Sequence, residues 1–395
     1  MSSNQREIQR KDKRAEKERK TKKIIWVTIA VVIVILAVMR IFEFNVNSVK
    51  ERFTDEEGNF SISEGVESTN FPYSIDASEN VVLKSINNKI CVLTPTTYTV
   101  LDSKNATVDY TFDHGFSNPV LVSSGIYSLI YDQGQNHYRL DTTSDAVYSE
   151  ASENKILCAD VSKGGTAVIA TTSSKKLCEF NVYNKSLKNT CNIQLSEGYI
   201  IDIAISADGR KVAAAVVSSD NANLITKIFM YDVSKQALAS QTDLPGGNVA
   251  DIRFSGSALY VVGDTYAGVV RGGEYKPSYE QGDIVTEYYD YTASGELVLA
   301  FGGYTNSTEN KIALIRPNGK VKRELDFNGV IKDISTSGNV VSILTGNSVT
   351  GLAMSNGEVR EELATDDSTK SICRIGSVVY MQRQSTIDRS DLKND

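Results

Sequence analysis

The twelve residues DIRFSGSALYVV, residues 251–262, contain the pattern that decides the fold of this chain. Ile252 and Phe254 alternate with polar residues before Gly256, and a nearly continuous apolar run follows it. Glycine supplies the positive φ that a tight hairpin turn requires, and β-branched and aromatic residues favour strands. The stretch therefore predicts two antiparallel strands joined by a short turn.

The same phrase recurs along the chain: an aspartate, a β-branched or aromatic residue, three more residues and a glycine. It is clearest at residues 160–165, 251–256, 290–295 and 333–338, and it is lengthened at 202–209. The equivalent turn residues, spaced by 37 to 47 positions, are Asn88, Gly125, Gly165, Gly209, Gly256, Gly295, Gly338 and Gly376. A period near 40 residues is typical of one blade of a β-propeller.

A second set of polar breaks lies between these turns, and strand-like stretches flank each break. The breaks are centred near Lys104, Thr143, Lys185, Lys235, Gly273, Asn318 and Asn356. Each repeat unit then holds four strands. We predict an all-β chain: an eight-bladed β-propeller of four-stranded antiparallel blades, with seven blades as the alternative.

The last blade is short of sequence, because only nineteen residues follow Gly376. The segment GNFSISEGVES, residues 58–68, has strand-like alternation. We expect it to supply the missing outer strand, since a ring closed in this way leaves no sheet edge exposed. The propeller would then be one cooperative domain over residues 58–395.

An apolar run, IIWVTIAVVIVILAVM at residues 24–39, precedes all of these repeats. Counted through Phe42 it has nineteen residues, about 28 Å of helix, which matches a hydrocarbon core of about 30 Å. We predict one transmembrane helix over residues 24–42, acting as an uncleaved signal anchor. A cleaved signal peptide is the alternative, but its apolar region is shorter and ends in small residues, whereas Val38, Met39 and Arg40 follow here.

The distribution of charge predicts the orientation of this helix. Residues 1–23 carry ten Lys or Arg and four Asp or Glu, whereas the chain after Phe42 carries 31 basic and 45 acidic residues. Basic residues beside a spanning helix stay in the cytoplasm. We expect a cytoplasmic arm at 1–23, contact with the lipid bilayer through 24–42, a juxtamembrane spacer at 43–57 and an extracytoplasmic propeller. The acidic propeller argues against nucleic acid as a partner.

One blade carries a family resemblance. Residues 201–217, IDIAISADGRKVAAAVV, followed by KIFMYDV at 227–233, resemble a WD-repeat blade, whose first hairpin often carries a Ser-Pro-Asp-Gly turn. Ala207 replaces the proline, and the His and Trp signatures are absent, since Trp26 is the one tryptophan. The whole chain resembles an uncharacterised family, a domain of unknown function, of single-pass membrane-anchored β-propeller proteins from Gram-positive bacteria. The resemblance implies the fold and the anchor, and it implies no activity.

The chain has few of the residues that catalytic and metal centres use. Its two histidines, His114 and His137, are too few for a multi-histidine metal site and do not suggest a Ser-His-Asp triad. Its five cysteines include no CxxC pair, and we expect buried, unbridged side chains, although Cys178 and Cys191 lie within reach of one hairpin. We therefore expect no catalytic residue, no cofactor and no metal ion.

Four aspartates occupy equivalent places in the repeated phrase: Asp160, Asp251, Asp290 and Asp333. Because each lies on a predicted innermost strand, two roles are open. The carboxylates line the central channel, where a ring of negative charge holds a cation or a basic group. Alternatively, each accepts hydrogen bonds that fasten one blade to the next, and this role is favoured because the repeat itself explains residues that recur with it.

Tyrosines form a second candidate site. Eight of the nineteen lie between Tyr260 and Tyr304, and they include Tyr266, Tyr275 and Tyr279. Tyrosine is rigid, apolar and able to form hydrogen bonds, which suits a binding face. Packing within strands is the alternative, because tyrosine is common there.

These observations favour a non-enzymatic module that binds or scaffolds envelope proteins or an extracellular ligand, because a rigid ring presents loops for recognition. The alternative is a cell-surface hydrolase or lyase that cleaves polysaccharide with channel carboxylates, since two acids suffice for glycosidic cleavage.

Overall fold

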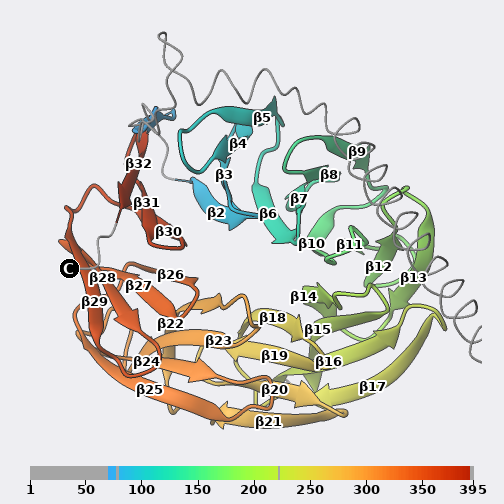
Figure 1. The fold of residues 1–395 in the computed structure, drawn as a ribbon. Helices are drawn as coiled ribbons and strands as arrows, with labels where there is room; N and C mark the ends of the chain where they lie inside the picture. The colour runs from blue at the N-terminus through green and yellow to red at the C-terminus, as the bar shows by residue number, and fades with distance from the viewer. Residues whose placement is uncertain (1–69, 77–79, 221–222, 392–395) are drawn as a thin grey trace, which may run out of the picture. The chain divides into compact units, whose positions relative to one another are not determined.

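The computed structural model describes residues 70–76, 80–220 and 223–391. Over these ranges thirty-two strands form eight four-stranded sheets, arranged as blades in a ring (Figure 1). The eight-bladed prediction is confirmed, and the seven-bladed alternative is wrong. The predicted arm, transmembrane helix and spacer, residues 1–57, lie outside the described residues. In the described part of the chain, no helix has the length and apolarity needed to cross a membrane.

The first four blades follow one another along the chain, and each is an antiparallel meander. Blade 1 contains β2 (Val82–Ile86), β3 (Lys89–Leu93), β4 (Thr97–Asp102) and β5 (Val108–Asp113). Blade 2 contains β6 (Pro119–Ser124), β7 (Tyr127–Asp132), β8 (His137–Thr142) and β9 (Ala146–Ala151). Blade 3 contains β10 (Ile156–Val161), β11 (Ala167–Thr172), β12 (Cys178–Tyr183) and β13 (Asn189–Leu195). Blade 4 contains β14 (Tyr199–Ile205), β15 (Lys211–Asp220), β16 (Asn223–Asp232) and β17 (Ala237–Asp243).

The remaining blades repeat this plan, except that the eighth combines both ends of the described chain. Blade 5 contains β18 (Val249–Ser255), β19 (Ala258–Gly263), β20 (Ala267–Arg271) and β21 (Glu274–Tyr279). Blade 6 contains β22 (Val285–Tyr291), β23 (Leu297–Gly302), β24 (Glu309–Ile315) and β25 (Val321–Asn328). Blade 7 contains β26 (Asp333–Ser337), β27 (Val340–Leu344), β28 (Ser348–Ala353) and β29 (Val359–Ala364). Blade 8 contains β30 (Ser371–Ile375), β31 (Val378–Gln382), β32 (Thr386–Asp391) and β1 (Tyr73–Ser74).

The inner hairpin of every blade turns at the residue that the repeat marks. All eight of these Gly or Asn residues have positive φ, between 60° and 80°. This left-handed conformation strains residues with a Cβ and explains why Gly or Asn recurs there. The sequence period therefore follows from a backbone requirement that is repeated once per blade.

The strand that closes the ring differs from the predicted one. β1 pairs with β32 through Tyr73 opposite Ile387 and Ser74 opposite Thr386, and the backbone N–H of Ile75 donates to Ser385 O at 2.9 Å. The N-terminal side does complete the eighth blade, with Tyr73–Ser74 in the place beside β32. Residues 58–68, which we expected there, lie outside the described residues.

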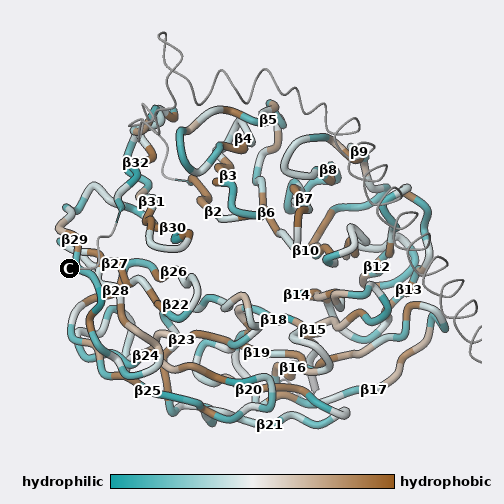
Figure 2. The backbone as a smooth tube through the Cα atoms, in the orientation of Figure 1, coloured by the Kyte–Doolittle hydropathy of each residue, from teal (hydrophilic) through white to brown (hydrophobic). Residues whose placement is uncertain are grey.

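The hydrophobic core lies at the boundaries between blades. The described residues form eight clusters of buried side chains, one at each boundary between neighbouring blades, including the boundary between blades 8 and 1. Figure 2 shows hydrophobic residues along middle strands such as β19 and β23, whereas the outer strand β25 is largely hydrophilic. All five cysteines are free and buried, so Cys178 and Cys191 are not bridged and serve as core side chains. Each blade is therefore covered on both faces by its neighbours.

Candidate functional site: the central channel

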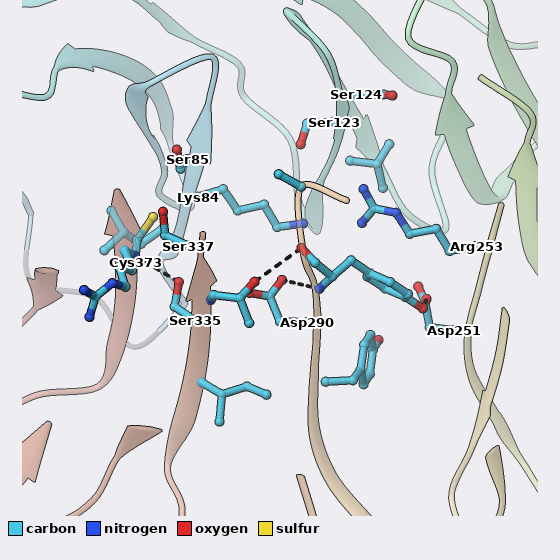
Figure 3. Close-up of a pocket in the computed structure, with 18 of the residues that line it drawn as sticks. Lys84, Ser85, Ser123, Ser124, Asp251, Arg253, Asp290, Ser335, Ser337 and Cys373 are labelled. Carbon is cyan, nitrogen blue, oxygen red and sulfur yellow. Dashed lines mark hydrogen bonds between the residues drawn. The ribbon is translucent and has the colours of Figure 1, made fainter. Parts of the chain in front are cut away.

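The innermost strands of all eight blades enclose a cavity of about 670 Å³, which we call the central channel (Figure 3). Each blade reaches the channel with the residues just before its inner turn. The repeated phrase therefore places its aspartates in the channel wall. All four predicted aspartates border the cavity, each half-buried.

Two of these aspartates make the same pair of hydrogen bonds. Asp160 Oδ1 accepts the backbone N–H of the next residue at 2.8 Å, and its Oδ2 accepts the N–H of Ile205 in blade 4 at 2.9 Å. Asp333 Oδ1 accepts the N–H of its own following residue at 2.8 Å, and its Oδ2 accepts the N–H of Ile372 in blade 8 at 2.8 Å. Each carboxylate thus joins its own strand to the inner strand of the following blade.

The other two aspartates vary this arrangement. Asp290 Oδ1 accepts a hydrogen bond from the backbone N–H of Tyr291 at 2.7 Å. Its Oδ2 accepts hydrogen bonds from the N–H and the hydroxyl of Thr336 in blade 7, at 2.7 Å and 2.8 Å. Asp251 Oδ2 accepts a hydrogen bond from the hydroxyl of Tyr291 in blade 6. In every case the acceptor connects one blade to the next, while the same carboxylate borders the channel.

A fifth aspartate, Asp202 of blade 4, belongs to this set. Its Oδ1 accepts the next N–H at 2.9 Å, and its Oδ2 accepts the N–H of Ile252 in blade 5 at 2.8 Å. The site prediction omitted Asp202, although the lengthened phrase at 202–209 carried the signal. Five consecutive blades, 3 to 7, therefore contribute one carboxylate each. We call these residues the aspartate arc: Asp160, Asp202, Asp251, Asp290 and Asp333.

Burial in the channel wall shifts the acidity of the whole aspartate arc. It raises the pKa of Asp160 to about 6 and the pKa of Asp333 to about 7. The pKa of Asp202 lies well above its usual value, first because of burial and second because of the charge of Asp251. Burial also raises the pKa of Asp251 and of Asp290. The hydrogen bonds favour the ionised form, but the loss of water outweighs them.

Two basic residues that the sequence did not mark extend into the channel from opposite sides, toward one another, beside Asp290 (Figure 3). Lys84 of blade 1 donates from Nζ to Leu121 O of blade 2 at 3.1 Å. The guanidinium of Arg253 in blade 5 lies over the ring of Tyr291, 4.6 Å from its centroid. The side chain of Lys84 is open to solvent in the channel but is enclosed by the channel wall. Its pKa is lowered, first by this partial loss of water and second by the charge of Arg253. Among the described residues, neither base forms an ion pair with a carboxylate.

The remaining wall is uncharged or already neutralised. Blades 1 and 2 contribute no aspartate to the channel wall. They line the cavity with three serines: Ser85, Ser123 and Ser124. Arg374 borders the cavity from blade 8, but its guanidinium forms a bidentate ion pair with Glu361 of blade 7, at 2.6 Å and 3.0 Å. The channel is therefore polarised, with carboxylates along blades 3 to 7 and hydroxyl groups on blades 1 and 2.

The tyrosine site does not form a common surface. Tyr266, just before β20, is completely buried because it packs in the core between blades 4 and 5. Its assignment to a binding face was therefore wrong. Tyr275 is half-buried, and its ring meets that of Tyr266 edge-on at 6.1 Å. Tyr279 is half-buried on β21 and donates its hydroxyl to Glu324 of blade 6 at 2.6 Å. These contacts match the packing alternative.

The histidines lie apart from the channel lining. His137 is exposed at the start of β8, and His114 lies in the loop between blades 1 and 2. Among the described residues, no group of three or more His, Cys, Asp or Glu side chains is arranged to hold a metal ion. The five carboxylates of the aspartate arc are not gathered into such a group.

Solved structures share the architecture at low sequence identity. The computationally designed Ika8 protein gives a TM-score of 0.58 at 10% identity, covering 81% of this chain and 99% of that chain. The C-terminal WD40 domain of Sif2 gives 0.57 at 12% identity, covering 80% and 97%. BamB from Moraxella catarrhalis gives 0.50 at 12% identity, covering 80% and 95%. These likenesses show the fold alone.

Sequence comparison gives the family but no activity. No curated protein matches the chain. A family model described as a family of unknown function, DUF5711, matches residues 65–391, which include all eight blades. The chain therefore belongs to the DUF5711 family of unknown function.

Proposed function

We propose that this chain is a non-enzymatic binding module, a membrane-anchored extracytoplasmic β-propeller whose central channel recognises an extracellular ligand or part of an envelope protein. The channel carries this proposal, because it is a cavity of about 670 Å³ whose polar side chains come from many blades. Cavities of this size hold small ligands and exposed side chains of partners. Hydrogen bonds to the next blade hold the carboxylates in place, which lowers the entropy lost on binding.

The extracytoplasmic address rests on the apolar segment and the charge distribution. Nineteen residues at 24–42 have the length of one membrane crossing, and the basic arm before them favours the cytoplasm. Protease added to wall-stripped cells tests this. We expect digestion of the propeller in intact cells. Protection until the cells are lysed would contradict the proposed orientation.

A binding role agrees with how the carboxylates are used. Asp160 and Asp333 each direct one oxygen to an N–H of their own strand and the other to the next blade. A nucleophile or general base needs an oxygen that is free to approach substrate. These carboxylates are thus better suited to stay in fixed positions than to change partners during turnover.

Polysaccharide cleavage is the second candidate, favoured by one observation. Burial raises the pKa of Asp160 to about 6 and of Asp333 to about 7, so a fraction of these groups carries a proton at neutral pH. A glycosidase acid needs such a proton. Full-length protein incubated with cell-wall glycans separates the two functions. Saturable binding without products supports the module, whereas products that disappear in Asp160→Asn and Asp333→Asn variants support the enzyme.

Crosslinking in intact cells tests the binding role directly. A photoreactive residue at Ser123, in the channel, is expected to capture a ligand or partner that the same residue at exposed Asp326 on β25 does not. Equal labelling from both positions would contradict a channel site.

A further inference from the structure

The channel presents unmatched groups of both signs. Arg253 has five N–H donors, and its guanidinium lies over the ring of Tyr291, yet among the described residues it forms no hydrogen bond and no ion pair. Lys84 has three donors and uses one, toward Leu121 O. Both side chains extend toward the middle of the cavity (Figure 3). Two like charges that point at one another in a confined space are stabilised by an anionic group between them.

The aspartate arc acts on these bases through its charge, but among the described residues it forms no ion pair with either of them. The side chain of Asp290 receives three hydrogen bonds, from its neighbour and from Thr336. A carboxylate nevertheless has about four lone-pair sites. The arc thus retains acceptors and negative charge that point to a cationic group at the same cavity.

The position of the two sets suggests how they act together. The charges of Asp251, Asp290 and Asp160 act on Lys84 across the channel. Acidic and basic groups therefore face one cavity without forming ion pairs. A ligand that carries one charge leaves the opposite set unmatched: a simple cation meets Lys84 and Arg253, and a simple anion meets the aspartate arc.

We propose that the central channel binds a small zwitterion, a free amino acid or a short peptide with both termini free. This inference rests on the proposed binding function and names its ligand class. The carboxylate of the ligand lies between Arg253 and Lys84, where a guanidinium offers two parallel donors. The ammonium group faces Asp251 and Asp290, and the hydroxyl of Ser123 lines the same cavity. Both opposing sets are then satisfied by one molecule.

Arg253 supplies the sharpest variant, because its side chain forms no hydrogen bond to another blade. Arg253→Gln removes the charge and the contact with the Tyr291 ring but no hydrogen bond between blades, so the variant is expected to fold, which its melting temperature checks. Arg271→Gln is the matched control, since Arg271 is exposed at the end of β20 and does not border the channel. Lys84→Met is a second channel variant, which removes the other cationic donor.

The experiment is calorimetric titration of the full chain in detergent with the dipeptide Ala-Ala and with two capped forms. N-acetyl-Ala-Ala keeps only the negative end, and Ala-Ala amide keeps only the positive end. We expect Ala-Ala to bind at least tenfold more tightly than either capped form. Arg253→Gln is expected to weaken Ala-Ala binding at least tenfold, and Arg271→Gln to leave it unchanged.

Three outcomes overturn the proposal: no binding of Ala-Ala to folded protein, equal binding of Ala-Ala and its amide, or an Arg253→Gln variant that binds as the parent does. Channel-specific crosslinking from Ser123 remains informative in each case. If that crosslink persists while Ala-Ala fails to bind, the binding module stands and the zwitterion is wrong. If the crosslink is also absent, the binding function itself is wrong.

Discussion

At the scale of single residues, the aspartate arc combines two roles in the same carboxylates. Asp333 borders the channel and also accepts the N–H of Ile372, at 2.8 Å, in the next blade. In asparagine an NH₂ group replaces one of the two oxygens that accept these hydrogen bonds, so one backbone N–H loses its acceptor. At pH 8, where the carboxylate is mostly ionised, we expect Asp333→Asn to lower the free energy of unfolding by about 2 kcal/mol. Urea denaturation measures this, and exposed Asp326→Asn on β25 is the control. Equal stability of the two variants would show that Asp333 does not fasten the blades.

The raised acidity of the arc also predicts how stability depends on pH. An unfolded aspartate has a pKa of about 3.9, whereas that of Asp160 is about 6 and that of Asp333 about 7 in the fold. Between these values the folded state binds more protons than the unfolded state. The contribution of these groups to the free energy of unfolding therefore falls as pH rises from about 4 to about 7.

Urea midpoints at pH 5 and pH 8 measure this contribution. We expect the Asp333→Asn variant to lose less stability across this interval than the parent, because it lacks one of the titrating groups. A fall as large as that of the parent would contradict the assignment.

Repetition is the reason that part of the site could be predicted. Asp160, Asp251 and Asp290 recur with the repeat, so their place on inner strands follows from the period. Lys84 and Arg253 do not recur, and they meet only because the ring brings blades 1 and 5 to opposite sides of one channel. A local pattern contains no information about that meeting.

At the scale of elements, the inner turns were predictable because the requirement for positive φ is local. The closing strand was not, because β1 has only two residues, too few to show alternation. Contacts from elsewhere hold this segment: Phe71 packs against Tyr380, with ring centroids 5.6 Å apart, and Ile75 donates to Ser385 O. Residues 58–68 had the stronger strand pattern, but pattern alone does not decide which segment reaches β32.

Substitution at Ile75 tests the closing strand. Ile75→Pro removes the N–H that donates to Ser385 O at 2.9 Å, whereas Ile75→Val keeps it and changes the side chain little. We expect the proline variant to be less stable than the valine variant by about 1–3 kcal/mol. Its freed β32 edge is also expected to promote self-association. Urea denaturation and sedimentation velocity measure the two effects, and identical behaviour of the variants would mean that β1 does not close the ring.

At the scale of the whole molecule, closure makes the blades interdependent. In an open array of repeats each unit contacts only its neighbours, and terminal repeats can fray. The ring has no terminal blade, because one buried cluster lies at each of the eight boundaries, and the cluster between blades 8 and 1 includes Leu101 and Tyr380. Opening any boundary uncovers the apolar faces of two blades.

This interdependence predicts that damage at the closing strand is felt across the ring. Hydrogen exchange followed by mass spectrometry compares Ile75→Pro with Ile75→Val in two places: β30 to β32 of blade 8, and β10 to β13 of blade 3. Because the slowest amides exchange by global opening, we expect them to exchange faster in both blades of the proline variant, by the same factor. Faster exchange confined to blade 8 would mean that the blades unfold separately. Faster exchange by the same factor in both blades means that the stability of blade 3 depends on β1, which belongs to blade 8. Loss of β1 then weakens the channel wall formed by the aspartate arc.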